Sequence, residues 1–120
     1  MKILIVDDSK AMRMIVTRTL RQAEMGEFSL IEASNGSEAL ERVTRDEPDL
    51  VLTDWNMPQM GGLELLQALQ AREDRTRVGV VTSEGTAEIR QAAATAGALF
   101  LISKPFTPET FRAAIAPLMR

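Results

Sequence analysis

Apolar residues along the chain fall into five short runs, each about as long as a buried strand. The runs are residues 3–6, 28–33, 50–53, 78–81 and 98–102. Most are continuously apolar, which is typical of strands in a sheet that is covered on both faces. The run at 28–33 is weaker and partly polar, which favours a place nearer the sheet edge.

Segments with apolar residues at helical spacing lie between these strands and after the last one. Residues expected to begin helices are Ser9, either Ser34 or Asn35, and Thr107 followed by Pro108. Residues expected to end or interrupt them are Gly26, Pro48, Gly97 and Pro117, with Gly61 and Gly62 forming a loop before the third helix. The side chains expected to face the core are Met12, Ile15, Val16, Thr19, Leu20, Ala23, Ala39, Leu40, Val43, Leu63, Leu65, Leu66, Leu69, Ile89, Ala92, Ala93, Ala96, Phe111, Ile115 and Leu118.

Five strands that alternate with five helices predict an α/β fold. Right-handed crossovers then give a mostly parallel sheet with helices on both faces, which is a doubly wound architecture. A length of 120 residues is enough for one such domain.

Composition excludes several classes of function. The net charge of -3 gives no reason to expect nucleic acid or a membrane surface as a partner, and no apolar run approaches the roughly 18 residues of a membrane span. The absence of cysteine excludes disulfides and fits a cytoplasmic protein. The absence of histidine excludes imidazole acid–base catalysis and imidazole metal ligands, so any chemistry uses carboxylates, lysines and hydroxyls.

Polar residues follow four of the five predicted strands. They are Asp7 and Asp8, then Asp54, then Thr82 and Ser83, and finally Lys104. Each has an ordinary explanation by itself, such as a turn, a helix cap or a solvated charge. Because the carboxyl ends of parallel strands meet at one edge, the set together indicates a site.

Three carboxylates at one edge repel one another, and Lys104 supplies one positive charge. An all-oxygen cluster suits a hard divalent cation such as Mg²⁺, held by Asp7, Asp8 and Asp54 with a backbone carbonyl just past Asp54. Such an ion beside a lysine and the Thr82 hydroxyl forms a receptor for a phosphoryl group, with Asp54 as the nucleophile. An aspartyl phosphate is reactive toward water, which suits a reversible switch.

Four motifs in this order, KILIVDDS, LVLTDWNMP, VVTSE and SKPF, resemble the receiver domains of two-component response regulators along the whole chain. The match is closest to the stand-alone chemotaxis type. The resemblance implies a flavodoxin-like sheet with strand order 2-1-3-4-5, and a single receiver domain over residues 1–120 with no output domain.

The resemblance also implies a role for each site residue. Asp54 is the phosphoacceptor, Asp8 binds Mg²⁺ directly, Asp7 binds it through water, the main-chain carbonyl of Asn56 completes the ligands, Thr82 is the switch hydroxyl and Lys104 pairs with the phosphoryl oxygens. Phosphorylation in this family remodels the surface of helix four, strand five and helix five.

The resemblance also draws attention to Asn56, Glu84, Pro105 and Leu101, which in this family affect the decay of the phosphoryl group and the switch. Asn56 and Glu84 are similar to the polar pair of fast-decaying chemotaxis regulators, and the bond before Pro105 is similar to the family's cis peptide. Leu101 departs from the family, which usually has an aromatic residue there as the partner of the threonine switch. Phe100 is adjacent, but strand alternation places it on the opposite face.

The resemblance implies a sensor histidine kinase as phosphodonor and a downstream target protein, such as a motor or chemotaxis component, with a phosphatase as a third class of partner. We expect a monomer that is not an enzyme in the usual sense but takes part in its own phosphotransfer and dephosphorylation.

Three alternatives are weighed against this hypothesis. A flavodoxin-like cofactor binder would need a phosphate loop where Asp7 and Asp8 stand. A phosphatase with an aspartate nucleophile would carry a second aspartate where Asn56 stands. A degenerate, non-phosphorylated receiver would not keep the complete acidic, threonine and lysine set.

Overall fold

The structure is a computed structural model that describes residues 1–119. A five-stranded, fully parallel sheet runs through its middle in the order β2-β1-β3-β4-β5. The strands are β1 (Lys2–Val6), β2 (Ser29–Ala33), β3 (Leu50–Thr53), β4 (Arg77–Thr82) and β5 (Phe100–Ser103). The helices within the described residues are α1 (Lys10–Gln22), α2 (Gly36–Asp46), α3 (Gly62–Ala71), α4 (Ala87–Thr95) and α5 (Pro108–Ile115), followed by the 3-10 turn η1 (Ala116–Met119). The predicted fold class and strand order are therefore confirmed.

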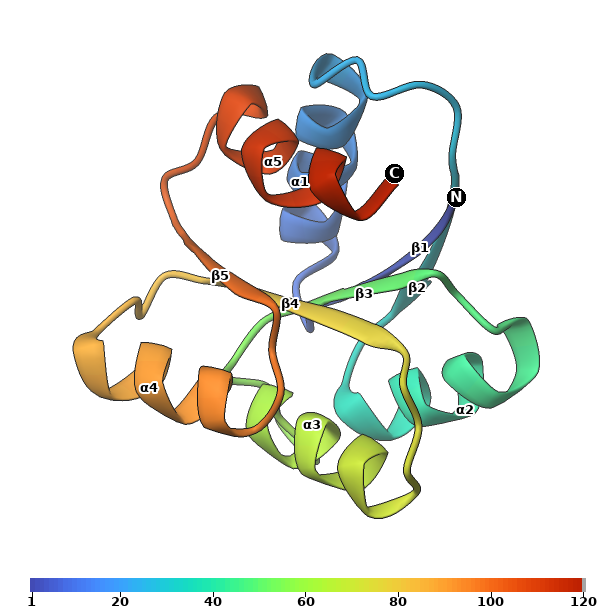
Figure 1. The fold of residues 1–120 in the computed structure, drawn as a ribbon, viewed down its shortest axis with the longest axis vertical. Helices are drawn as coiled ribbons and strands as arrows, with labels where there is room; N and C mark the ends of the chain where they lie inside the picture. The colour runs from blue at the N-terminus through green and yellow to red at the C-terminus, as the bar shows by residue number, and fades with distance from the viewer. Residues whose placement is uncertain (120) are drawn as a thin grey trace.

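Helices cover both faces of the sheet, which is seen nearly edge-on in Figure 1, with α1 and α5 on one face and α2, α3 and α4 on the other. Alternate strand residues enter two separate cores. One contains Val6, Val51 and Val80 with α2, α3 and α4, and the other contains Ile5 and Leu52 with α1 and α5. No helix of residues 1–119 has the length and apolar character needed to cross a membrane.

Most helix boundaries follow the predicted signals. Ser9 caps α1 by accepting the Met12 N–H, and Asn35 rather than Ser34 caps α2. Thr107 caps α5 in a capping box with Thr110. The α5 helix ends at Ile115, two residues before Pro117, as expected for a residue that cannot donate the next helical bond.

Two predicted boundaries are wrong. The fifth strand begins at Phe100 rather than Ala98, because the Ala98 N–H closes the end of α4 on the Ala93 carbonyl at 2.9 Å. The α1 helix ends at Gln22 rather than near Gly26.

Two other local predictions are also corrected. Ile15, expected to face the core, is 39% exposed, because the buried stripe of α1 runs through Val16 and Leu20. The pair Gly61 and Gly62 is not a loop before α3 but its N-cap and first residue.

Gly79 in the middle of β4 is paired with Phe100 of β5, and the aromatic ring occupies the space where a β4 side chain would lie. A Cβ on Gly79 would fall 2.2 Å from the ring, which is far inside van der Waals contact. The glycine therefore makes room for Phe100 on the α1–α5 face.

We expect Gly79→Ala to lower the free energy of unfolding by about 1–3 kcal/mol, because the added methyl forces the ring out of its packed position. Chemical denaturation of the single variant and of Gly79→Ala with Phe100→Leu tests this. The double variant should recover part of the loss, and fully additive effects would contradict the proposed clash.

Candidate functional site

Three carboxylates converge where β1 and β3 end. Asp7, Asp8 and Asp54 each offer an oxygen, and these oxygens all lie within 4.8 Å of one another. The parallel pairing of Val6 with Thr53 brings the two strand ends side by side, so the residues that follow must share the same edge. The sequence prediction that these acids meet is therefore matched by the geometry.

Lys104 reaches this cluster from the end of β5. Its Nζ lies 3.7 Å from Asp7 Oδ2 and 3.9 Å from Asp54 Oδ2. The backbone N–H of Lys104 donates to the Thr82 carbonyl at 2.9 Å, and the Lys104–Pro105 peptide is cis, as the sequence resemblance implies. One ammonium group at these distances neutralises only part of the charge of three carboxylates.

Asp7 is the most buried of the three acids, at 5% exposure. Burial raises the pKa of Asp7 above the ordinary value of 3.8, and the nearby Asp54 charge raises it further. A hydrogen bond from the Ser9 N–H and the positive charge of Lys104 lower it, but by less. The Ser9 N–H donates to Asp7 Oδ1 at 2.9 Å. A buried carboxylate with a raised pKa gains from a bound cation, and this all-oxygen donor set fits Mg²⁺.

The segment after β3 is pressed closely against the start of α3. A Cβ on Gly62 would lie 2.5 Å from the Asp54 carbonyl oxygen, and one on Gly61 would lie 2.6 Å from that of Trp55. The Trp55 N–H donates to Asp54 Oδ1 at 2.7 Å. Sequence reasoning missed this role of the two glycines, although their place just beyond the Asp54 turn was a usable signal.

Thr82 is buried at the end of β4, and its hydroxyl accepts the Glu84 N–H at 3.2 Å. Asn56 and Glu84, the expected modulating pair, are exposed on neighbouring loops. Leu101 packs into the core on the α2–α4 side and Phe100 into the opposite one, which confirms that Phe100 does not lie on the same face as Leu101.

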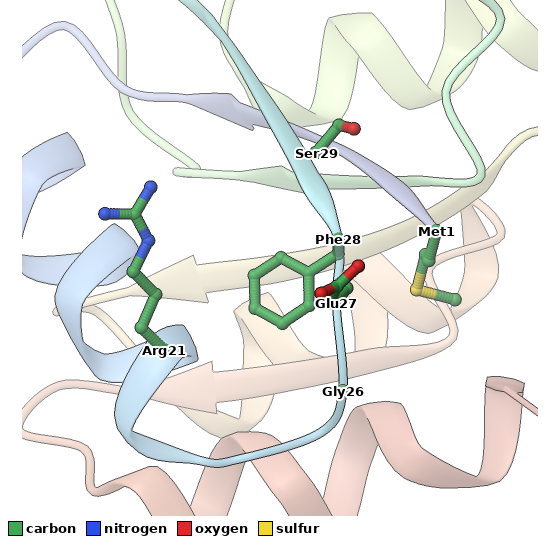
Figure 2. Close-up of a pocket in the computed structure, with 6 residues that line it drawn as sticks. All are labelled: Met1, Arg21, Gly26, Glu27, Phe28 and Ser29. Atoms are coloured by element: carbon green, nitrogen blue, oxygen red, sulfur yellow. The ribbon is translucent and has the colours of Figure 1, made fainter.

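Two of the cavities lie at different ends of the sheet strands. Figure 2 shows the residues that line one cavity, including Met1, Phe28 and Ser29, near the starts of β1 and β2 and at the opposite end of the strands from the acids. The volume of this cavity is about 560 Å³. A second cavity of about 460 Å³ is lined by Trp55, Asn56 and residues of α3, on the segment that follows Asp54. The chemistry-bearing residues therefore lie beside the second cavity and away from the first.

Comparison with known proteins gives the family. The model of the response regulator receiver domain matches residues 3–116. The chain is a response regulator receiver domain. The receiver is 43% identical over 116 residues to the chemotaxis protein CheY homolog of Campylobacter jejuni, covering 93% of this chain and 87% of the relative.

Other relatives extend the comparison. The receiver is 35% identical over 114 residues to sporulation initiation phosphotransferase F of Bacillus subtilis, covering 95% of this chain and 90% of that one. Among solved structures it is similar to the chemotaxis protein CheY4 of Vibrio cholerae, with a TM-score of 0.84 and 32% identity over 98% of this chain and 97% of that one.

The raised pKa of Asp7 gives the receiver a testable pH dependence. Because the folded state holds the Asp7 proton to higher pH than the unfolded state, the contribution of Asp7 to stability is complete below pH 3.8. That contribution is lost as the pH rises through the folded pKa. We expect metal-free Asp7→Asn to be more stable than the unmodified chain at pH 7, with the difference shrinking as the pH falls toward 3.8.

Thermal unfolding at a series of pH values measures this difference. Mg²⁺ should then stabilise the unmodified chain more than the variant, since only the former keeps all three acids. A metal-free Asp7→Asn protein that is less stable at pH 7 would contradict the account.

Proposed function

We propose that this receiver accepts a phosphoryl group on Asp54 in a Mg²⁺-dependent reaction and acts as a reversible signalling switch. The observation that carries the proposal is the meeting of Asp7, Asp8, Asp54 and Lys104 at one edge of the sheet. Asp7, Asp8, Asp54 and the Asn56 carbonyl would hold the ion. When bound, Mg²⁺ would neutralise the acids and the oxygens of the incoming phosphoryl group.

The transfer is a displacement at phosphorus. A carboxylate oxygen of Asp54 forms the new P–O bond, and the P–N bond of a donor phosphohistidine breaks, with its electron pair leaving on the donor's imidazole nitrogen. Lys104 would pair with the phosphoryl oxygens, and the 3.9 Å distance from its ammonium group to Asp54 Oδ2 supports this role. Water later attacks the phosphorus, which releases inorganic phosphate and restores the carboxylate.

Thr82 would connect this chemistry to the surface. Its hydroxyl now accepts the Glu84 N–H, so a turn toward a phosphoryl group on Asp54 would loosen the start of the β4–α4 loop. The output surface would be α4, β5 and α5, where Arg90 donates to the Gly85 and Leu101 carbonyls at 3.3 and 3.4 Å. Leu101 has no ring to rotate, so the output step in this receiver would differ from the aromatic switch.

The proposed chemistry implies a protein that donates the phosphoryl group and a target protein that binds the altered surface. A sensor histidine kinase would supply the phosphoryl group, and a target protein would read the α4–β5–α5 surface, with a phosphatase as a further partner. Relatives named as chemotaxis proteins favour a chemotaxis target, and a relative named as a phosphotransferase is consistent with phosphoryl transfer. The phosphatase and cofactor-binder alternatives lose support, because Asn56 stands at the phosphatase acid position and two acids follow β1.

Asp54→Asn should abolish phosphorylation, because an amide cannot attack phosphorus. Treatment with Mg²⁺ and a small phosphodonor should add one phosphoryl mass to the unmodified chain and none to this variant. Trp55 is the only tryptophan and there is no tyrosine. The Trp55 backbone N–H donates to Asp54 Oδ1, so Trp55 adjoins the phosphorylated group and its fluorescence should change on phosphorylation of the unmodified chain alone.

Asp74→Asn is the matched control, since Asp74 precedes β4 and its carboxylate is held by Thr76. Equal mass gain in the unmodified chain and Asp54→Asn, or no gain in either, would contradict the proposed function.

Lys104→Met should separate metal binding from phosphotransfer. Removing the ammonium group from the acids should tighten Mg²⁺ binding, because a competing cation is lost. Phosphorylation should nevertheless slow by roughly 10²-fold, as expected when one charged donor to a transition state is removed.

Trp55 fluorescence titration and the rate of phosphorylation measure the two effects. Lys2→Met is the control, because Lys2 lies at the start of β1, at the opposite end of the strands from the acids. An unchanged phosphorylation rate in Lys104→Met would show that Lys104 does not act on the phosphoryl group.

A further inference from the structure

Arg13 lies on α1 beside the acidic cluster but is bound to other groups. Its Nη1 donates to the main-chain carbonyl of Asp7 at 2.6 Å, and its Nε donates to Glu32 Oε1 on β2 at 2.8 Å. The Arg13 side chain is 15% exposed, so the guanidinium group is held between α1, β1 and β2. In the described part of the chain its ion-pair partner is Glu32, and the three site carboxylates stay free of it.

The direction of the Asp8 carboxylate is set by the backbone on either side of this residue. It is exposed, and within residues 1–119 its carboxylate accepts no hydrogen bond and makes no ion pair that would fix a rotamer. The peptide before Asp8 is held through the Asp7 carbonyl by Arg13. On the other side, the Ser9 N–H is held by Asp7 Oδ1, and the Ser9 hydroxyl caps α1.

We propose that Arg13 is a positioning residue for the metal site. By fixing the Asp7–Asp8 peptide, it orients the Asp8 carboxylate toward those of Asp7 and Asp54. This inference rests on the proposed Mg²⁺ site and adds to it a residue that touches neither the ion nor the phosphoryl group. It follows the general rule that groups around the ligands of a metal hold those ligands in place.

Charge and geometry make opposite predictions for Arg13. Removing a positive charge near a cation site should tighten Mg²⁺ binding by electrostatics alone. Removing the hydrogen bond that orients a ligand should weaken it. Glu32 already offsets the charge of Arg13 at 2.8 Å, so the loss of orientation should prevail.

A Mg²⁺ titration of the unphosphorylated chain, followed by Trp55 fluorescence, tests the proposal. Arg13→Met should bind Mg²⁺ about 10-fold more weakly than the unmodified chain. Glu32→Gln keeps Arg13 and its bond to Asp7, so its affinity should change less. Arg42→Met is the matched control, because it removes an arginine that pairs with Asp46 within α2.

Ca²⁺ distinguishes positioning from a general loss of structure. Mg²⁺ demands near-ideal octahedral ligands, whereas Ca²⁺ accepts varied geometry. Arg13→Met should therefore lose more affinity for Mg²⁺ than for Ca²⁺. If Arg13→Met does not fold, Arg13→Lys, which keeps the charge but cannot hold both partners with a planar group, should show the same selective loss.

Each outcome has a distinct meaning. Unchanged or tighter Mg²⁺ binding, or equal losses for both ions, would overturn the role of Arg13. No response of the unmodified chain to Mg²⁺ by fluorescence or calorimetry would instead contradict the proposed metal site itself.

Discussion

The repulsion among three carboxylates at one edge of a parallel sheet is the constraint on which the rest of this receiver depends. One oxygen from each of Asp7, Asp8 and Asp54 lies within 4.8 Å of the others. The strands that precede these acids are buried in two cores, so the backbone at Asp7 and Asp54 cannot move apart without disturbing the sheet. Lys104 relieves part of the repulsion. The remaining charge favours a cation, and in the proposed function that cation would help to bind the incoming phosphoryl group.

The fold holds this site in place through ordinary packing. Alternate residues of β1 and β3 enter opposite cores, which fixes the register that puts Val6 beside Thr53 and the following acids beside each other. Gly62 allows α3 to begin against the Asp54 carbonyl, so the loop carrying the phosphoacceptor candidate is backed by a helix. Stability and site geometry therefore depend on the same contacts.

Much of the fold could be predicted from the sequence because its signals are local. Continuous apolar runs predicted the strands, and the capping residues Ser9 and Thr107 predicted where two helices begin. The parallel topology predicted that Asp7 and Asp54 lie together where the strands end. The resemblance supplied the strand order and the particular role of each site residue.

The rest depends on contacts that form only once the helices and strands are in place. The β5 strand begins at Phe100 rather than Ala98 because the Ala98 N–H donates to the Ala93 carbonyl just beyond the end of α4. Ile15 is exposed because Val16 and Leu20 form the buried stripe of α1. No local pattern indicates that Arg13 reaches the Asp7 carbonyl and Glu32 together, since that contact needs α1, β1 and β2 already in place.

The central claim is that a divalent cation belongs among these three carboxylates. Anomalous diffraction from crystals grown with Mn²⁺, an oxygen-seeking ion that suits the same ligands as Mg²⁺, tests it most directly. The account predicts a single strong peak at ligand distance, roughly 2.0–2.5 Å, from carboxylate oxygens of the acidic cluster. Manganese bound elsewhere, with the Asp7, Asp8 and Asp54 cluster empty at saturating Mn²⁺, would contradict it.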